Sequence, residues 1–234
     1  MAFPKREEVL FYAKLAESCE RFEDMMQYMR LISKFEQQLS IEEISLFSVA
    51  LKNLAAVRKT GIRSLQIYEQ QEQNENLKML ITKKLRQIEF ELIYILEDAI
   101  EILDQKLNEP DNQGPLQSKI RYLKIKNESL AILYELKLCS DSIISDTLDT
   151  NIKMLETAKV KFNGSDANRL IQSINLFKFY YHICKDPTKA QIVGQSAIDA
   201  ALADEENITE DSIQWMNCLK GYMNELKQEY KEIS

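Results

Sequence analysis

The sequence predicts an all-α protein, and three observations point to that fold class. The 234 residues include only five glycines and four prolines, so few turns and long elements are expected. Leu, Ile, Glu, Lys, Gln and Met dominate the composition, and these are mostly good helix formers. Apolar residues also recur at helical spacing, as between residues 76 and 107. With 45% hydrophobic residues, the chain has ample material for a core.

Four helices are predicted in the first half of the chain. The third of them has the clearest start, because Ser40 and Glu43 have the spacing of a capping box. The fourth carries a broad apolar stripe that includes Leu85, Leu92 and Leu96. The expected bounds are about Pro4 to Ser18, 22–36, Ser40 to Gln71, and 76–107.

The segment "NEPDNQGP", residues 108–115, holds half of the prolines and predicts a loop between an N-terminal and a C-terminal group of helices. Gly164 in "NGSD" predicts a helix C-cap, and Pro187 lies near a helix start. Five further helices are expected at 116–138, 143–162, 166–184, 188–204 and 209–231. Consecutive helices with short connections should pack antiparallel, so nine antiparallel helices in one domain, 1–234, are expected.

A tetratricopeptide-type helical array is a structural alternative. Residues 166–204 have its helix-turn-helix character, but the sequence shows no self-similarity at the 34-residue period of such repeats.

Charge and composition exclude several classes of protein. The net charge of -7 argues against general nucleic-acid binding, which favours a basic footprint. No run of 18 apolar residues occurs, so no membrane span is expected. The start of the chain lacks the apolar core of a signal peptide. The widely separated cysteines, interpreted as small buried apolar residues, suggest a reducing, cytoplasmic setting: Cys19, Cys139, Cys184 and Cys218.

The sequence offers little enzymatic chemistry. Its only histidine, His182, lies among apolar residues, where a packed or capping role is more common than a role as base or ligand. The hydrolase elbow, the Walker A loop and the dinucleotide-binding glycine motif are all missing. Neither an enzyme nor a cofactor or metal site is therefore expected.

One basic stripe stands out in the segment "SLFSVALKNLAAVRKTGIRS", residues 45–64. At about 100° per residue, Lys52, Lys59 and Arg63 share a narrow face of a helix, whereas Arg58 points elsewhere. Small residues lie between these bases on the same face. The stripe is either an ordinary solvated face or one wall of an anion site.

Four segments resemble the 14-3-3 family in order and spacing. They are "AKLAESCERFEDM" (13–25), "SLFSVALKNLAAVRKTGIRS" (45–64), "YLKIKNESLAILYEL" (122–136) and "RLIQSINLFKFYYHICKDPTKA" (169–190). The resemblance covers nearly the whole chain and weakens after about residue 205. It implies a dimeric cup of nine helices, in which each subunit has an amphipathic groove for a phosphoserine or phosphothreonine peptide.

The resemblance also assigns a dimer surface, formed by the first helix against the third and fourth helices. Arg21 and Glu91 occupy positions from which they can pair across that surface. The basic partner expected for Asp24 is replaced by Gln87. The residues matching family dimer positions are Leu15, Cys19, Arg21, Leu65 and Glu91, so a homodimer or a heterodimer with another family member is expected.

The phosphate pocket departs from the family pattern. By resemblance, Lys52 matches the family's lysine, and Lys59 replaces an arginine without its bidentate fork. Ala131 and Ile132 stand where the family has a second arginine and a tyrosine. The remaining groove positions are Lys124, Ile174, Asn175 and Lys178, with Lys178 replacing a small hydrophobe. On the last helix, Tyr222 or Asn224 matches a second family asparagine, depending on register.

These replacements predict weakened or altered binding. A hydrogen bond to a charged group contributes about 1.5–3 kcal/mol, so losing two partners costs about 3–6 kcal/mol unless Arg63 or Lys178 compensates. Three functions stay open. They are a signalling adaptor for phosphorylated or acidic peptide segments, a non-binding dimerisation partner of a competent 14-3-3 paralogue, and a tetratricopeptide-like scaffold.

Overall fold

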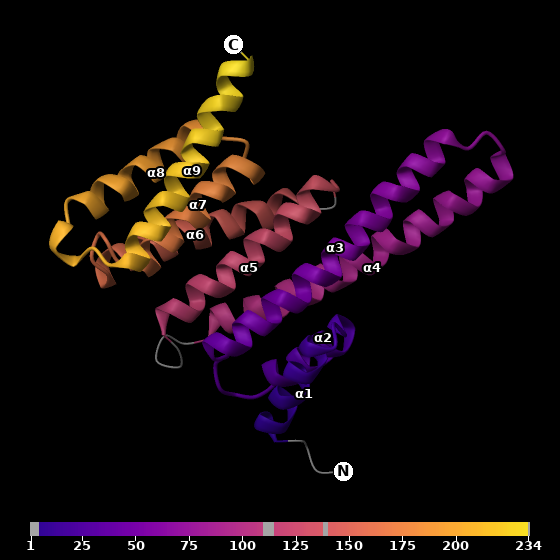
Figure 1. The fold of residues 1–234 in the computed structure, drawn as a ribbon, viewed down its shortest axis with the longest axis horizontal. Helices are drawn as coiled ribbons and strands as arrows, with labels where there is room; N and C mark the ends of the chain where they lie inside the picture. Colours follow the sequence, from indigo (N-terminus) through magenta and orange to yellow (C-terminus); the bar gives the residue numbers. More distant parts are fainter. Residues whose placement is uncertain (1–4, 110–114, 138–139, 234) are drawn as a thin grey trace. The chain divides into compact units, whose positions relative to one another are not determined.

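A computed structural model describes residues 5–109, 115–137 and 140–233, with side chains as far as residue 228 (Figure 1). Over these ranges the chain is helical and contains no strand, which confirms the predicted all-α class. The helices are α1 (Arg6–Ser18), α2 (Phe22–Ser33), α3 (Ile41–Gln71), α4 (Glu75–Asn108), α5 (Leu116–Glu135), α6 (Asp141–Lys161), α7 (Ala167–Lys178), the π-helical turn η2 (Phe179–Ile183), α8 (Pro187–Leu202), the short 3₁₀ turn η3 (Glu205–Asn207) and α9 (Glu210–Ile233).

The chain forms two compact units, residues 1–118 and 119–234, here called the N-terminal and C-terminal units. The boundary follows the segment 108–115 that was predicted to separate two helix groups, of which residues 110–114 lie outside the described ranges. The organisation of 1–234 as a single domain stays a prediction.

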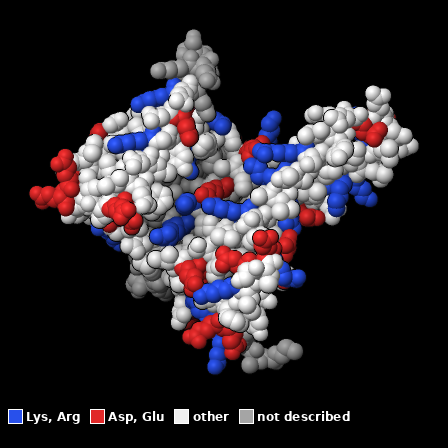
Figure 2. All heavy atoms as spheres, viewed as in Figure 1, with Lys and Arg blue, Asp and Glu red and all other residues white. Residues whose placement is uncertain are grey.

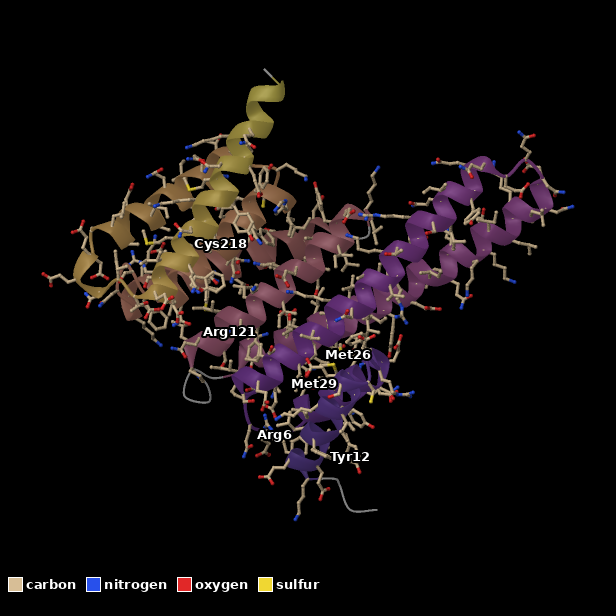
Figure 3. All side chains as sticks on the ribbon, viewed as in Figure 1. Arg6, Tyr12, Met26, Met29, Arg121 and Cys218 are labelled. Atoms are coloured by element: carbon tan, nitrogen blue, oxygen red, sulfur yellow. The ribbon has the colours of Figure 1, made fainter. Side chains whose placement is uncertain are left out.

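In the N-terminal unit, α3 and α4 form a long antiparallel pair, and α1 and α2 pack beside it (Figure 1). The core lies where one face of α2 meets α3 and α4. Ion pairs tie the same helices together outside the core: Arg30 of α2 contacts Asp98 of α4 at 2.7 Å, and Arg58 of α3 contacts Glu23 of α2 at 2.9 Å. The main core side chains are Met25, Met26, Met29, Ile32, Phe47, Leu54, Leu92, Leu96 and Leu103, with Met26 and Met29 labelled in Figure 3.

The start of α3 is held by a capping box and by an ion pair with α1. As predicted, Ser40 and Glu43 form a capping box, with the Glu43 N–H donating to Ser40 Oγ at 3.2 Å and the Ser40 N–H to Glu43 Oε2 at 2.7 Å. The Glu43 carboxylate also accepts from Arg6 Nε at 2.8 Å and from Arg6 Nη2 at 2.6 Å. Burial raises the pKa of Glu43, but the hydrogen bonds from Arg6 and Ser40 outweigh it and hold that pKa below its usual value.

In the C-terminal unit, α7 is the central element and packs against α6, α8 and α9. The core between these helices contains Leu155, Leu170, Ile174, Phe177, Ile198, Leu219 and Met223. Asp166 caps α7 by accepting from the Asn168 N–H at 2.7 Å. Gly164 approaches α8 so closely that an added Cβ would lie 2.1 Å from the carbonyl oxygen of Ala200.

Several predicted boundaries need correction. Helix α2 ends at Ser33 instead of residue 36, and α5 ends at Glu135, before the predicted residue 138, which lies outside the described ranges. The C-cap of α6 is Phe162, so Gly164 does not have the predicted capping role. The predicted helix 166–184 is α-helical only to Lys178 and continues as η2.

The cysteines also differ from expectation. Cys19 is exposed, which contradicts the predicted burial, whereas Cys184 and Cys218 are free, half-buried thiols packed against the core of the C-terminal unit. Cys139 lies outside the described residues. Among the described helices, none is both long and apolar enough to cross a membrane.

Candidate functional site

A pocket of about 220 Å³ lies between α5, α7 and η2, entirely within the C-terminal unit. It brings together five residues that the sequence had singled out: Lys124, Ala131, Ile174, Asn175 and Lys178. The remaining lining residues are Asn127, Glu128, Phe179, His182 and Ile183, which sequence reasoning had not placed in a groove. We call this site the α5–α7 pocket.

A buried amide network fixes the helices that carry the pocket. Asn127 of α5 and Asn151 of α6 exchange side-chain hydrogen bonds at 2.9 and 3.0 Å. Gln172 of α7 donates to the Asn151 carbonyl at 3.0 Å, so α5, α6 and α7 are joined through one set of amides. Such a network rigidifies its surroundings because unpaired buried amides are costly.

Asn175 is positioned by the same network. Its Nδ2 donates to the Ile120 carbonyl and to Gln172 Oε1, both at 3.2 Å. Both amide hydrogens are therefore used inside the unit, whereas Oδ1 accepts no hydrogen bond from the described residues. Since Asn175 lines the pocket, Oδ1 can accept a hydrogen bond from a ligand, such as a peptide N–H.

Two lysines of the pocket lie against aromatic rings of α9. Lys178 Nζ is 4.1 Å from the ring centroid of Tyr222, and Lys124 Nζ is 5.9 Å from that of Trp215. Both distances fall within the range of cation–π contacts. Burial and a hydrogen bond with the Cys218 thiol raise the pKa of Tyr222 to about 12, so its ring stays neutral near pH 7.

Ala131 and His182 together separate the α5–α7 pocket from a second hollow. That hollow has a volume of about 690 Å³, and the two cavities share only these two lining residues. Ala131 contributes just a methyl group at the place where the resemblance expects an arginine, and Ile132 beside it is half-buried. His182 is exposed and lies in the last turn of η2, with its ring centroid 4.7 Å from that of Tyr181, and its packed or capping role stays a prediction.

The turn η2 shapes the end of the pocket. It is defined by an i to i+5 hydrogen bond from the Cys184 N–H to the Phe179 carbonyl at 3.1 Å. Phe179, His182 and Ile183 of this turn all line the α5–α7 pocket. Single π-helical turns of this kind are frequent at functional sites.

Lys52 and Lys59 lie on α3 of the N-terminal unit, where Lys52 is exposed and Lys59 half-buried. Arg58 points to another face, as predicted, and pairs with Glu23 at 2.9 Å and with Glu91 at 3.8 Å. The grouping of Lys52 and Lys59 with the residues of the α5–α7 pocket stays a prediction.

The predicted dimer residues lie on α1, α3 and α4 of the N-terminal unit and in the turn between α1 and α2, where Cys19 is the C-cap of α1 and Arg21 the N-cap of α2. Leu15 and Cys19 are exposed, and Leu65 is half-buried. Within one chain Arg21 pairs with Asp24, and Glu91 accepts from Gln87 Nε2 at 3.1 Å. The pairing of Arg21 with Glu91 across a dimer therefore stays a prediction.

An apolar surface surrounds these dimer positions. Phe11 and Tyr12 are exposed beside Leu15 on α1, and Figure 3 labels Tyr12. Phe90 and Tyr94 are exposed on α4, where they line a hollow of about 650 Å³. Exposed apolar patches of this kind commonly mark protein interfaces.

Charged residues of both signs lie side by side on the surface of the described part of the molecule (Figure 2). The face in Figure 2 carries Lys and Arg interspersed with Asp and Glu on both units. Within the described ranges, no group of three or more His, Cys, Asp or Glu side chains is arranged to hold a metal ion.

Comparison with known proteins decides the family. The sequence model of the 14-3-3 protein family matches residues 12–227. The chain belongs to the 14-3-3 family. It is 33% identical to 14-3-3 protein zeta of Bombyx mori, over 88% of this chain and 84% of the relative. It is 32% identical to 14-3-3-like protein 2 of Caenorhabditis elegans, with the same coverage.

A fungal relative gives a similar result. The 14-3-3 protein homolog of Candida albicans is 32% identical, over 88% of this chain and 80% of the relative. The tetratricopeptide-like scaffold considered from the sequence is therefore not the architecture of this chain, which is a 14-3-3 adaptor-like protein.

Proposed function

We propose that this 14-3-3 family member is a dimeric, non-enzymatic signalling adaptor of the cytoplasm. Its groove binds phosphorylated or acidic peptide segments of client proteins, with an affinity that is weakened or altered relative to the family pattern. By resemblance, the groove uses Lys52 and Lys59 of the N-terminal unit in addition to the residues of the α5–α7 pocket.

The observation that carries this proposal is the composition of the α5–α7 pocket. Lys124 and Lys178 supply positive charge, Asn175 offers an acceptor for a peptide N–H, and Ile174 contributes an apolar wall. This combination of a few oriented polar groups on a largely apolar wall suits an extended peptide that carries negative charge.

Ala131 and Ile132 support the altered affinity. Neither side chain can donate a hydrogen bond to phosphate, whereas an arginine and a tyrosine could donate three or more. Lysines remain as point charges, which attract phosphate without the bidentate geometry of a guanidinium. A ligand therefore gains charge attraction in this groove but less geometric selectivity for phosphate.

The exposed apolar residues of the N-terminal unit support dimer formation. Phe11, Tyr12 and Leu15 are exposed on α1, and Phe90 and Tyr94 are exposed apolar residues of a hollow on α4 that otherwise has polar and charged lining. A two-fold dimer in which α1 of each subunit meets α4 of the other buries both surfaces at once.

The test is a titration of a fluorescent, degenerate phosphoserine peptide library into the purified protein. The matched control is the same library without phosphate, and Lys52→Glu is the control variant. We expect micromolar, phosphate-dependent binding that Lys52→Glu abolishes. Binding that is equal with and without phosphate, and unaffected by Lys52→Glu, would exclude Lys52 from the ligand site.

A second candidate function is that of a non-binding dimerisation partner. Two observations together favour it: α1 and α4 expose apolar residues suited to a dimer, whereas the pocket has Ala131 where the family has an arginine. Such a chain pairs with a competent paralogue and lowers its avidity, because one site replaces two linked sites. Mixing the protein with a tagged competent paralogue tests this idea, and failure to recover mixed dimers excludes it.

A further inference from the structure

The position of Lys178 in the α5–α7 pocket indicates a more specific role than general attraction of negative charge. We propose that Lys178, held against Tyr222, is the specificity-determining residue of the pocket and selects peptides with an aspartate or glutamate beside the phosphorylated residue. This inference rests on the proposed peptide-binding function and names the ligand class of the same site.

The rings of Tyr222 and Phe177 support the Lys178 side chain on one side. Its ammonium lies 4.1 Å from the Tyr222 ring centroid, and the Tyr222 ring stacks in turn on the fully buried Phe177 at 6.4 Å. Lys178 and Phe177 belong to α7, whereas Tyr222 belongs to α9. Because the ring is supported by the core, Lys178 loses less side-chain entropy on binding than a solvated lysine would.

The ammonium keeps donors for a ligand. Among the described residues, no carboxylate lies within ion-pair distance of Lys178 Nζ. An aromatic face attracts the cation without accepting three conventional hydrogen bonds, so N–H groups on the far side of the ammonium are available. Lys178 is half-buried, which strengthens its attraction to an incoming carboxylate relative to a fully solvated pair.

The charges of the lining residues make Lys178 the source of the pocket's net positive charge. The formal charges of Lys124 and Glu128, which both line the pocket, offset each other. Lys178 then supplies the net positive charge, with His182 as the only other titratable lining residue. A compact ammonium suits the single charge of a carboxylate side chain, whereas a phosphate monoester is better matched by an arginine fork.

The test uses two degenerate phosphoserine peptide libraries that differ only in having glutamate or the isosteric glutamine at the flanking positions. Fluorescence anisotropy with the full chain measures both affinities. We expect the wild-type protein to bind the glutamate library about tenfold more tightly, the value of one charge-assisted hydrogen bond. Lys178→Met should remove this preference, and Lys220→Met, on the exposed side of α9, should retain it.

Two variants at Tyr222 test whether the aromatic ring is needed to position the charge of Lys178. Tyr222→Phe keeps the aromatic face and should keep the preference, whereas Tyr222→Leu removes the face and should reduce it to about threefold. Circular dichroism of each variant establishes that the helices are intact.

The outcomes distinguish this inference from the function on which it rests. Equal binding of the two libraries by the wild-type protein, or a preference that survives Lys178→Met, would overturn the role of Lys178 while leaving peptide binding intact. Absence of binding to either library would overturn the proposed peptide-binding function and this inference with it.

Discussion

Arg6 in the N-terminal unit and Lys178 in the C-terminal unit are both half-buried cations, but they have different partners. Arg6 makes a bidentate pair with Glu43, whose side chain is only 3% exposed. Lys178 lies over the ring of Tyr222 at the wall of a pocket. A cation satisfied by a buried carboxylate holds helices together, whereas a cation held by a ring can still attract an anion.

The same difference extends to other residues of each unit. In the N-terminal unit, Arg30 and Arg58 also pair with carboxylates on neighbouring helices. In the C-terminal unit, Lys124 lies near the Trp215 ring, and side-chain amide hydrogen bonds join the α5, α6 and α7 helices. We therefore expect substitutions of these ion-paired arginines of the N-terminal unit to affect mainly stability, and a substitution of Lys178 to affect mainly ligand binding.

Breaking the Arg6–Glu43 pair gives the largest expected effect. Glu43→Ala leaves the Arg6 guanidinium without its carboxylate and removes half of the α3 capping box. We expect the free energy of unfolding to fall by about 3–5 kcal/mol, as for other broken buried ion pairs. Urea denaturation followed by circular dichroism measures it. Glu42→Ala, at the neighbouring exposed position, is the matched control, and an equal loss in both variants would contradict the role assigned to Glu43.

Introducing an arginine at the α5–α7 pocket tests whether a cation there affects ligand binding. Ala131→Arg places a guanidinium where the α5–α7 pocket meets the second hollow, which leaves room for it. We expect phosphopeptide affinity to rise by about tenfold to a hundredfold, from one added charge-assisted interaction. Ala203→Arg adds the same charge at an exposed position elsewhere in the C-terminal unit. A similar gain in this control would show that net charge alone determines binding.

A substitution in the proposed dimer surface should have a smaller effect, on the affinity between the two subunits. Leu15 is 44% exposed, so Leu15→Asp should leave the helices intact while placing a charge in the proposed dimer contact. We expect the dimer dissociation constant to rise at least about tenfold, as measured by analytical ultracentrifugation. Ile213→Asp, at an exposed position on α9, should leave it unchanged. Unchanged dimerisation of Leu15→Asp would exclude α1 from the interface.

The acid dependence of stability gives the smallest expected effect. The pKa of Glu43 is lowered in the folded state despite burial, through hydrogen bonds from Arg6 and Ser40. The stabilisation by the ionised Glu43 is therefore fully present above the ordinary pKa of a glutamate, 4.5, and is lost as the pH falls through the lower pKa of the folded state. We expect the difference in unfolding free energy between wild type and Glu43→Gln to shrink as the pH is lowered from 6 to about 3. A difference that is constant with pH would contradict this linkage.

Much of the fold could be predicted because its signals are local in sequence. Ser40 and Glu43 are three residues apart, and their capping box correctly placed the start of α3. The change from α7 to η2 at Phe179 could not be predicted, because "FKFYYHI" is a largely aromatic and apolar segment with no glycine or proline to mark a change of helix type. The exposure of Cys19 and His182 also escaped prediction, since residue type alone does not fix which helix face is covered.

Some residues of the candidate site could also be identified from the sequence, and others could not. Resemblance identified Lys124, Ile174, Asn175 and Lys178, and all four line the α5–α7 pocket. The support of Lys178 by Tyr222 lay beyond the sequence, because the two residues belong to different helices and meet only through tertiary packing. The lining residues Glu128 and His182 show no motif of their own, so only the folded chain reveals them.

The most direct test of the contrast between Arg6 and Lys178 is to measure stability and binding on one variant, Lys178→Met. We expect its unfolding free energy to stay within about 1 kcal/mol of wild type, since a cation–π contact at a half-exposed site contributes about that much. Its affinity for the glutamate-containing phosphoserine library should fall about tenfold. A loss of 3 kcal/mol or more in stability, about the value of a broken buried ion pair, with unchanged peptide affinity would contradict the account, because Lys178 would then hold the helices together as Arg6 does.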